Sequence, residues 1–486
     1  MGRPSTISFR SKTVTIVLAI LVGIEVVSLV EQAIAPELPT GGFNLQVVIS
    51  TVFQVLAPFS PLLIILILYS WVGRLISNLV NKLDSNRTLS GRFSFLSRFL
   101  DRFPMSWDGK NIPLLSSPVV VLAIGMASSC FLAFTPYRPD INPTGTPVGA
   151  DTATYIQWVN QMLQRPFPDA LAYAFSQASK GSRPLSLIFP YVISGVFGVQ
   201  GDVSVKLYPL FLAPLLVVSS FLFVFLGLGD KHTAGLVGLM TAFSFQFTVG
   251  MWAGYYANWL ALAESYLLLG FLLRFTNNGP KASFVGIVLL SLALLFTHPW
   301  TWDLMILLSI TFMVERFLRS HYFRPFRLTI LFVAINVAFD SIKSFALGGY
   351  SGGRAGLDIA SSSIGFSRLL AFWPDVVALF VQNYDGLMAD ALVLGLALMV
   401  AWRSSGASDG FSRLLVWWIT LASLPFPFLG SVLQTRIVYL LPIPVLASAA
   451  IIGIGKLGTG NGQRGLILLA IVLYGANYSL SSMLRV

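Results

Sequence analysis

An apolar stretch from Ser117 to Phe134, SPVVVLAIGMASSCFLAF, is followed by a polar loop and then by Gly149-Ala150-Asp151-Thr152-Ala153-Thr154-Tyr155. The apolar stretch is long enough to enter a bilayer as a helix. The second stretch puts a carboxylate just beyond it, before an amphipathic segment with several aromatic residues. A carboxylate in that position is well placed to act on a molecule whose other half lies in lipid.

Composition extends the membrane setting to the whole chain. Of the 486 residues, 55% are apolar and only 10% are charged, and the mean hydropathy is +0.78. A helix needs about 20 apolar residues to cross the hydrocarbon core, and stretches of that length recur throughout. We therefore expect an all-α polytopic membrane protein with about thirteen transmembrane helices, at residues 13–35, 45–72, 116–135, 205–228, 233–253, 256–275, 281–298, 301–316, 326–345, 386–402, 411–432, 436–456 and 464–483.

The basic residues orient these helices. Short cytoplasmic loops carry an excess of Lys and Arg, and a cytoplasmic amino terminus puts most of the 31 basic residues on the inner side, including the clusters Arg74 to Lys110 and Arg316 to Arg327. A membrane crossing by the apolar run from Leu185 to Val199 would place these two clusters on opposite sides. We expect that run to lie along the surface, the amino terminus to be cytoplasmic and the carboxyl terminus extracytoplasmic, in a protein of the cell membrane.

The net charge of +11 follows from this orientation and from attraction to anionic inner-leaflet lipids. The basic residues are scattered through membrane-flanking loops, without the basic and aromatic interleaving that binds single strands, so we expect no nucleic-acid partner. The single cysteine, Cys130, excludes an internal disulfide, and with only three histidines we expect no metal site.

The chain divides into two parts. Residues 1–115 hold a transmembrane hairpin and a basic cytoplasmic segment of amphipathic character. Residues 116–486 hold about eleven of the predicted helices and two outer loops, 136–204 and 343–385. Glu25 and Glu31, in the first predicted helix, indicate either a contact with a partner helix or a solvated helix end, so a membrane partner subunit could bind through residues 1–72.

Three segments carry a family resemblance: Asp151-Thr152-Ala153-Thr154-Tyr155, the stretch from Arg183 to Gly198, and Arg436-Ile437-Val438-Tyr439-Leu440-Leu441-Pro442. With the long first outer loop and its surface helices, the layout of residues 116–486 resembles the GT-C superfamily of membrane glycosyltransferases, in particular its protein mannosyltransferase and aminoarabinose transferase branch. Two features differ. The loop aspartates, Asp140, Asp151, Asp169 and Asp202, are too widely spaced for a paired acidic motif, and no Trp-Trp-Asp-Tyr-Gly sequence is present.

The resemblance implies an inverting glycosyltransferase. Such an enzyme moves a sugar from a polyprenyl-phosphate donor, such as a dolichyl-phosphate sugar, to a hydroxyl of a glycan, lipid or protein acceptor on the extracytoplasmic face. A carboxylate would accept the proton of the attacking hydroxyl, and guanidinium groups would stabilise the departing phosphate. Because a monophosphate can be held by arginines alone, we expect neither a metal nor a cofactor.

Asp151 is the predicted general base, and its alternative role is the N-cap of a helix from Thr152 to Leu163. The two roles are compatible. Asp140 is the rival base, although its position between Pro139 and Asn142-Pro143 is more typical of a loop residue.

The remaining site residues also have two interpretations. Arg436, with Tyr439 one turn along, and Arg183 and Arg354 are predicted to bind the donor phosphate, whereas Arg436 could instead be a headgroup anchor and Arg354 part of a Gly-rich linker. His298, Trp300, Asp303 and Tyr155 are predicted to bind acceptor or sugar, whereas the tryptophans could be ordinary interfacial aromatics and His298 a turn residue.

Three further features qualify this picture. Glu264 lies inside a predicted helix, where a carboxylate is costly and is either functional or structurally paired. Asp340 and Lys343 are predicted to form an intrahelical pair. The alternative functions are a transporter, for which no internal repeat is found, and a non-catalytic lipid-handling subunit.

Overall fold

In the computed structural model, the described residues are 12–34, 45–83, 103–110, 112–278, 281–320, 323–363, 371–378, 390–458 and 460–485, and every regular element in these ranges is a helix. The elements are α1 (Lys12–Ile34), α2 (Leu45–Leu56), η1 (Ala57–Phe59), α3 (Ser60–Leu68), α4 (Ser70–Leu83), η2 (Pro113–Leu115), α6 (Pro118–Phe134), η3 (Thr135–Tyr137), α7 (Thr152–Leu163), α8 (Phe167–Ser176), η4 (Ala178–Gly181), α9 (Pro184–Phe197), α10 (Gly201–Leu228), α11 (Lys231–Ala242), α12 (Phe245–Ala253), α13 (Tyr256–Asn278), α14 (Lys281–Thr297), α15 (Pro299–Ser320), α16 (Phe323–Phe345), α17 (Gly352–Ser363), α19 (Ala391–Ser404), α20 (Gly410–Ser423), η5 (Phe426–Phe428), α21 (Ser431–Tyr439), α22 (Ile443–Gly455) and α23 (Asn461–Met483). Residues 371–378 are also helical.

Several of these helices meet the requirements of a membrane span. Within the described ranges, nine continuous helical stretches are long and apolar enough, and a tenth is formed if α21 and α22, which meet at 45°, are one broken span. The other three predicted segments are helical too, at α14, α15 and α19, but α14 and α19 have only 17 and 14 residues, and α15 carries Asp303, Glu315 and two arginines. The protein is therefore an all-helical polytopic membrane protein, and the figure of thirteen crossings stays a prediction.

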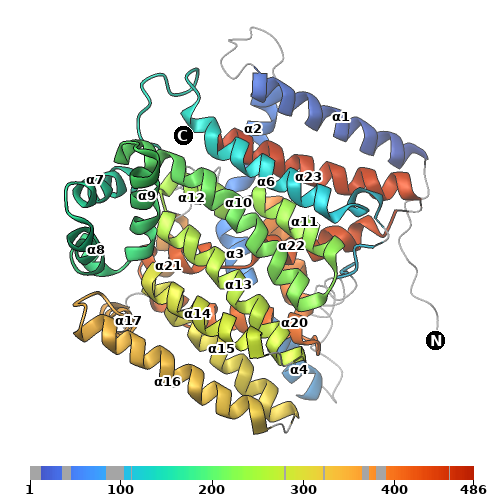
Figure 1. Ribbon diagram of the computed structural model, residues 1–486. Helices are drawn as coiled ribbons and strands as arrows, with labels where there is room; N and C mark the ends of the chain where they lie inside the picture. The colour runs from blue at the N-terminus through green and yellow to red at the C-terminus, as the bar shows by residue number, and fades with distance from the viewer. Residues whose placement is uncertain are drawn as a thin grey trace.

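The long helices run roughly together, and α7, α8 and α9 gather at one end of them (Figure 1). We call this the α7 end. α9 covers most of the apolar run that was expected to lie along the surface, and it has 14 residues. At 1.5 Å per residue it is about 21 Å long, which is short of the roughly 30 Å hydrocarbon core.

Side-chain caps and breaks fix where several helices begin and bend. Asp230, Ser244, Asp390 and Asp409 each accept a backbone amide hydrogen bond at the start of α11, α12, α19 and α20. The α21–α22 bend falls at Leu440–Pro442, where the proline ring cannot continue the preceding helix. This bend leaves α21, with Arg436 and Tyr439, as a separate short helix.

Buried amides fasten α1 to the rest of the bundle. The Gln32 amide donates to Asn477 Oδ1 on α23 at 2.9 Å, and the Asn477 amide donates to the Glu25 carbonyl at 3.0 Å and to the Glu25 carboxylate. Ser481 donates to Gln32 Oε1 at 2.9 Å. The partner helix of Glu25 is therefore α23 of the same chain, whereas Glu31 is exposed.

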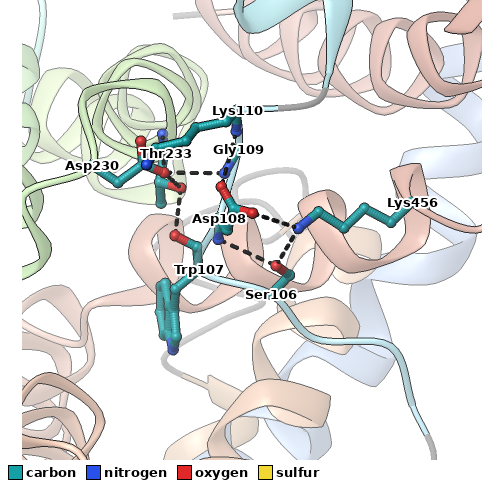
Figure 2. A network of polar contacts seen from close by, with 8 residues as sticks. All are labelled: Ser106, Trp107, Asp108, Gly109, Lys110, Asp230, Thr233 and Lys456. Carbon is teal, nitrogen blue, oxygen red and sulfur yellow. Dashed lines mark hydrogen bonds and ion pairs between the residues drawn. The ribbon is translucent and has the colours of Figure 1, made fainter.

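The segment 103–110 crosses the end of the bundle opposite α7 and joins α11 to α22. Asp230 accepts from the Gly109 amide at 3.0 Å and from the Thr233 hydroxyl at 2.6 Å, while Lys456 reaches Ser106 and Asp108 at 2.9 and 3.3 Å (Figure 2). Burial would raise the pKa of the Asp230 carboxyl, but these donors and the His232 amide lower it below its usual value. The aspartate therefore stays ionised and fixes the segment.

Candidate functional site

The turn before α7 is fused to the turn between α12 and α13. The Ala150 and Asp151 amides donate to the carbonyl oxygens of Trp252 and Ala253, both at 3.0 Å. At Gly149, with φ of +99°, a Cβ atom would stand 2.5 Å from the Met251 carbonyl oxygen, and at Gly254, with φ of +64°, it would stand 2.9 Å from the Thr152 amide. Glycine is thus required at both positions, because the two backbones approach too closely for a side chain.

This fusion holds Asp151 while leaving its side chain uncommitted. Asp151 occupies the N-cap position of α7, but its carboxylate makes no capping hydrogen bond. The carboxylate is partly buried, and burial raises its pKa, although the positive charges of Arg183 and Arg436 act in the opposite direction. The predicted N-cap position is therefore confirmed, whereas the capping bond is absent.

Arg183 is held beside Asp151 by aromatic residues of α7. Its guanidinium donates to the Tyr155 hydroxyl at 3.1 Å and lies 5.9 Å from the centres of the Tyr155 and Trp158 rings. The Tyr155 hydroxyl also accepts from the Ala257 amide at 3.2 Å, and the ring is fully buried. Tyr155 therefore positions Arg183 against α13. Because its ring is fully buried, Tyr155 is not exposed to contact an acceptor directly.

Arg436 approaches from α21. Its guanidinium lies 5.7 Å from the centre of the Trp300 ring, which lies 6.1 Å from Tyr350. Among the described residues no carboxylate lies within ion-pair distance of Arg436. Tyr439, one turn further along, is fully buried with its ring edge-on to Tyr255 at 6.1 Å. The structure thus brings Arg436 and Trp300 together and leaves Tyr439 in the packed wall beneath them.

His298 presents one ring nitrogen to this region. Its Nδ1 accepts from the Thr301 amide at 3.3 Å and pairs with the Thr301 hydroxyl at 2.7 Å, which assigns the ring proton to Nε2. Nε2 is buried, in a residue that is only 3% exposed, and the described part of the chain gives it no hydrogen-bond partner. A buried donor without a partner costs free energy, so a hydrogen-bond acceptor supplied by a ligand would account for it.

Other predicted residues lie apart from Asp151 or have different partners. Asp140 is exposed and forms a two-point ion pair with Arg138, at 3.1 and 2.5 Å, which lowers its pKa. Arg354 is exposed on the first turn of α17. Asp303 directs one oxygen toward Gly352, while the other is buried without a partner. None of these three has a contact with Asp151, Arg183 or Arg436.

The charge of Asp340 acts on Lys343, as expected for a pair, but among the described residues no direct ion pair joins the two side chains. Asp340 instead accepts from the amides of Gly352 and Gly353 at 2.7 and 3.0 Å, at the start of α17. Lys343 is fully buried and donates to the carbonyl oxygens of Leu295 and Ser182, at 2.5 and 3.5 Å. Both side chains therefore bond to backbone groups of other elements. Asp340 bonds to the start of α17, and Lys343 bonds to residues just before α9 and near the end of α14.

Two further features lie near His298 and Asp151. Glu264, the intramembrane carboxyl, accepts from the Thr297 hydroxyl at 2.9 Å, next to His298. A pocket of about 380 Å³ lies under the loop 141–150 and against Trp252, and its lining ends at Ala150, the residue before Asp151. The polar, proline-containing loop was the only sequence signal for this pocket.

The contacts described above test neither the expected absence of a metal nor the family resemblance. In the part of the chain that the structure describes, no group of three or more His, Cys, Asp or Glu side chains could hold a metal ion. No protein-family model matches the chain, and no curated protein is significantly similar to it. The resemblance to GT-C glycosyltransferases therefore stays a prediction from the three sequence segments.

Proposed function

We propose that this protein is a membrane glycosyltransferase that moves a sugar from a polyprenyl-phosphate donor to an acceptor hydroxyl at the α7 end. One observation carries the proposal. Asp151 is a partly buried carboxylate that receives no hydrogen bond on its side chain from the described residues, and two arginines from separate described elements act on its charge without an ion pair to it. A carboxylate beside two guanidinium groups that are not ion-paired to it suits a reaction that releases a proton and an anion together.

The proposed step balances as follows. The acceptor oxygen attacks the anomeric carbon, its proton passes to a carboxylate oxygen of Asp151, and the bond from the anomeric carbon to the phosphate oxygen breaks. The phosphate leaves with the electron pair and stays ionised, so it needs no acid. Arg183 and Arg436 would bind it, and the Nε2–H of His298 would donate a hydrogen bond to it.

This assignment moves His298 from the acceptor side to the phosphate side. Burial and the positive charges of Arg183, Arg436 and Lys343 all favour the neutral imidazole. A neutral ring with its proton on Nε2 can donate to an anion, while its basic Nδ1 is paired with Thr301. Trp300 would support Arg436 instead of binding acceptor. Tyr155 would position Arg183, and Asp303 and Arg354 have no role in this step.

The predicted orientation in the membrane agrees with a site on the extracytoplasmic face. The α7 end would be extracytoplasmic if the basic loops at the opposite end follow the positive-inside rule. The carboxyl terminus would then be extracytoplasmic and the amino terminus cytoplasmic. The apolar exposed faces of the long helices would give the lipid tail of a donor access from the bilayer.

The test compares Asp151→Asn with Asp140→Asn in purified protein, using a panel of radiolabelled polyprenyl-phosphate sugars. Loss of general-base catalysis should lower the rate of sugar release by about 10²–10⁴-fold in Asp151→Asn. Asp140→Asn removes an exposed carboxylate of the same loop and should retain activity. Full transfer by Asp151→Asn would reject this residue as the base. Movement of intact donor across vesicles without release of sugar would favour a transporter.

A further inference from the structure

The pocket beside Asp151 differs in chemistry from the arginine side of the same residue. Its lining residues, Ile141 to Thr144, Thr146 to Ala150 and Trp252, include no charged side chain. The volume of about 380 Å³ falls within the range of roughly 300–1,000 Å³ that is usual for small-molecule sites. The lining ends at Ala150, one residue before Asp151, and it includes neither of the arginines that act on the charge of Asp151.

The backbone of the pocket offers hydrogen-bond acceptors more than donors. Pro143 and Pro147 have no amide hydrogen. The amides of Gly145, Thr146 and Val148 donate within the loop or to Tyr137. The described residues donate no hydrogen bond to the carbonyl oxygens of Pro143 and Pro147. The amides of Thr144 and Gly149 also donate no hydrogen bond within the described part of the chain, but the carbonyl oxygens still favour a ligand that donates hydrogen bonds.

Asn142 makes this loop rigid. Its side-chain oxygen accepts from the Thr146 amide at 2.9 Å and from the Thr146 hydroxyl at 3.0 Å, while its amide donates to the Thr146 carbonyl at 2.8 Å. At the far end, the loop is joined to α12 through Ala150 and the Trp252 carbonyl. A loop held at both ends can present its carbonyl oxygens in a fixed arrangement, which limits the entropy lost on binding.

Trp252 is the aromatic residue of the pocket lining. The indole N–H donates to the Ser482 carbonyl at 3.1 Å, so the ring is held by its edge, and the side chain is partly exposed. A lining that combines an aromatic residue with backbone carbonyl oxygens suits a sugar, which presents C–H groups on one face and hydroxyl donors at its rim.

We infer that this pocket is the acceptor subsite and that it binds a neutral, hydroxyl-rich carbohydrate. The role as an acceptor subsite rests on the proposed function, whereas the binding of a carbohydrate can be tested without catalysis. A phosphorylated or carboxylated acceptor would find no cation in the pocket lining. A sugar in the pocket would lie next to Asp151, with the phosphate-binding arginines on the other side of the carboxylate.

The first test measures binding without turnover. Methyl glycosides of common hexoses serve as probes, and saturation-transfer NMR of purified protein reports their contact with wild type, Trp252→Leu and Trp252→Phe. We expect saturable binding to wild type, about tenfold weaker binding to Trp252→Leu, and binding close to wild type in Trp252→Phe, which keeps an aromatic face but loses the indole N–H. Absent binding to wild type, or equal binding to Trp252→Leu, would overturn the inference.

The second test separates this inference from the proposed function. Where an active donor and acceptor pair is found, Trp252→Leu should raise the KM for acceptor about tenfold while changing the KM for donor much less. An unchanged acceptor KM in an active enzyme rejects the pocket and leaves the transferase intact. Glycoside binding that depends on Trp252 in a protein with no transfer activity supports the pocket and rejects the transferase.

Discussion

At Asp151, two physical effects of opposite sign act on a single carboxyl group. Burial raises its pKa, and the charges of Arg183 and Arg436 lower it. A base must be deprotonated to act, so kcat/KM should fall as pH decreases through the pKa of this group in the free enzyme. Because the pKa is raised overall, this decline should begin at a higher pH than for an ordinary aspartate.

Removing one arginine gives a signed prediction. Arg183→Gln deletes a charge that lowers the pKa of Asp151, so the acidic limb of the kcat/KM profile should move to higher pH. Lys206→Gln removes the same charge from α10, where Lys206 pairs with Asp202 at 3.5 Å, and should leave the limb in place. A limb that moves to lower pH in Arg183→Gln, or moves equally in both variants, would contradict this account.

Gly149 tests the fusion of the two turns. In Gly149→Ala the new Cβ would meet the Met251 carbonyl at 2.5 Å and the residue would keep a positive φ, so we expect a lower Tm and a loss of activity as Asp151 shifts. Gly145→Ala is the matched control, since Gly145 also has a positive φ, of +59°, but has nothing within 4 Å. Its cost should be limited to backbone strain of about 1–3 kcal/mol. Equal effects of the two variants on Tm and activity would show that the close contact does not matter.

Local sequence patterns predicted that Asp151 lies at the start of α7, but not that its carboxylate makes no capping hydrogen bond. The helix expected from Thr152 to Leu163 is α7, with Tyr155, Val159 and Met162 buried and Trp158 half-buried. What the carboxylate does depends on the pairing of residues 150–151 with 252–253, because this pairing fixes the turn without a capping bond. A contact between segments about a hundred residues apart leaves no periodic signal in either segment.

At the scale of elements, the attachment of α1 to α23 depends on a few buried amides. Gln32→Leu leaves Asn477 Oδ1 and the Ser481 hydroxyl without their partner, and Asn477→Leu removes a partner of Gln32. Each change should lower the free energy of unfolding by about 1 kcal/mol. The double variant should lose less than the sum, because the second change removes groups that the first left unsatisfied. Apparent Tm values in detergent provide the measurement, and fully additive losses would contradict the contact.

The lengths of the apolar runs predicted where helices occur better than where these helices break and which groups their side chains contact. All thirteen predicted segments contain helix in the structure, because a long apolar run in a bilayer must satisfy its backbone internally. The break at Leu440–Pro442 was missed, and so were the direct hydrogen-bond partners of Asp340 and Lys343, which lie in other elements. In both cases the decisive factor is a local chain direction or a tertiary neighbour, which spacing along one helix does not encode.

At the scale of the whole molecule, the number of crossings decides which groups share a side of the membrane. Three helices fall short of the requirements for a membrane span: α14 and α19 are short, and α15 carries several charged residues. Thr144 lies in the loop before α7, and Ser408 lies between α19 and α20. Glu315, near the far end of α15, forms ion pairs with Arg413 and Arg319, so the start of α20 lies away from the α7 end.

This geometry makes the parity of the crossings measurable. If α14, α15 and α19 all cross, an odd number of spans separates Thr144 from Ser408, and the two residues lie on opposite sides. If these three helices do not cross, only α10, α11 with α12, α13 and α16 intervene, and both residues lie on the same side. We expect opposite sides, because successive helices from α13 to α16 pack against one another in sequence order and are joined by short turns, as in an alternating up-and-down bundle.

Thr144→Cys and Ser408→Cys report this directly in a Cys130→Ala background, since Cys130 is the only native thiol and both positions are exposed. A membrane-impermeant maleimide should label Thr144→Cys in intact cells and Ser408→Cys only after permeabilisation, as expected if the α7 end is extracytoplasmic. The reverse pattern would keep the thirteen crossings but put Asp151 in the cytoplasm, where the proposed donor chemistry would have to face the inner leaflet. Labelling of both positions from one side would reduce the number of crossings, because an even number would then separate the candidate site from the α19–α20 turn.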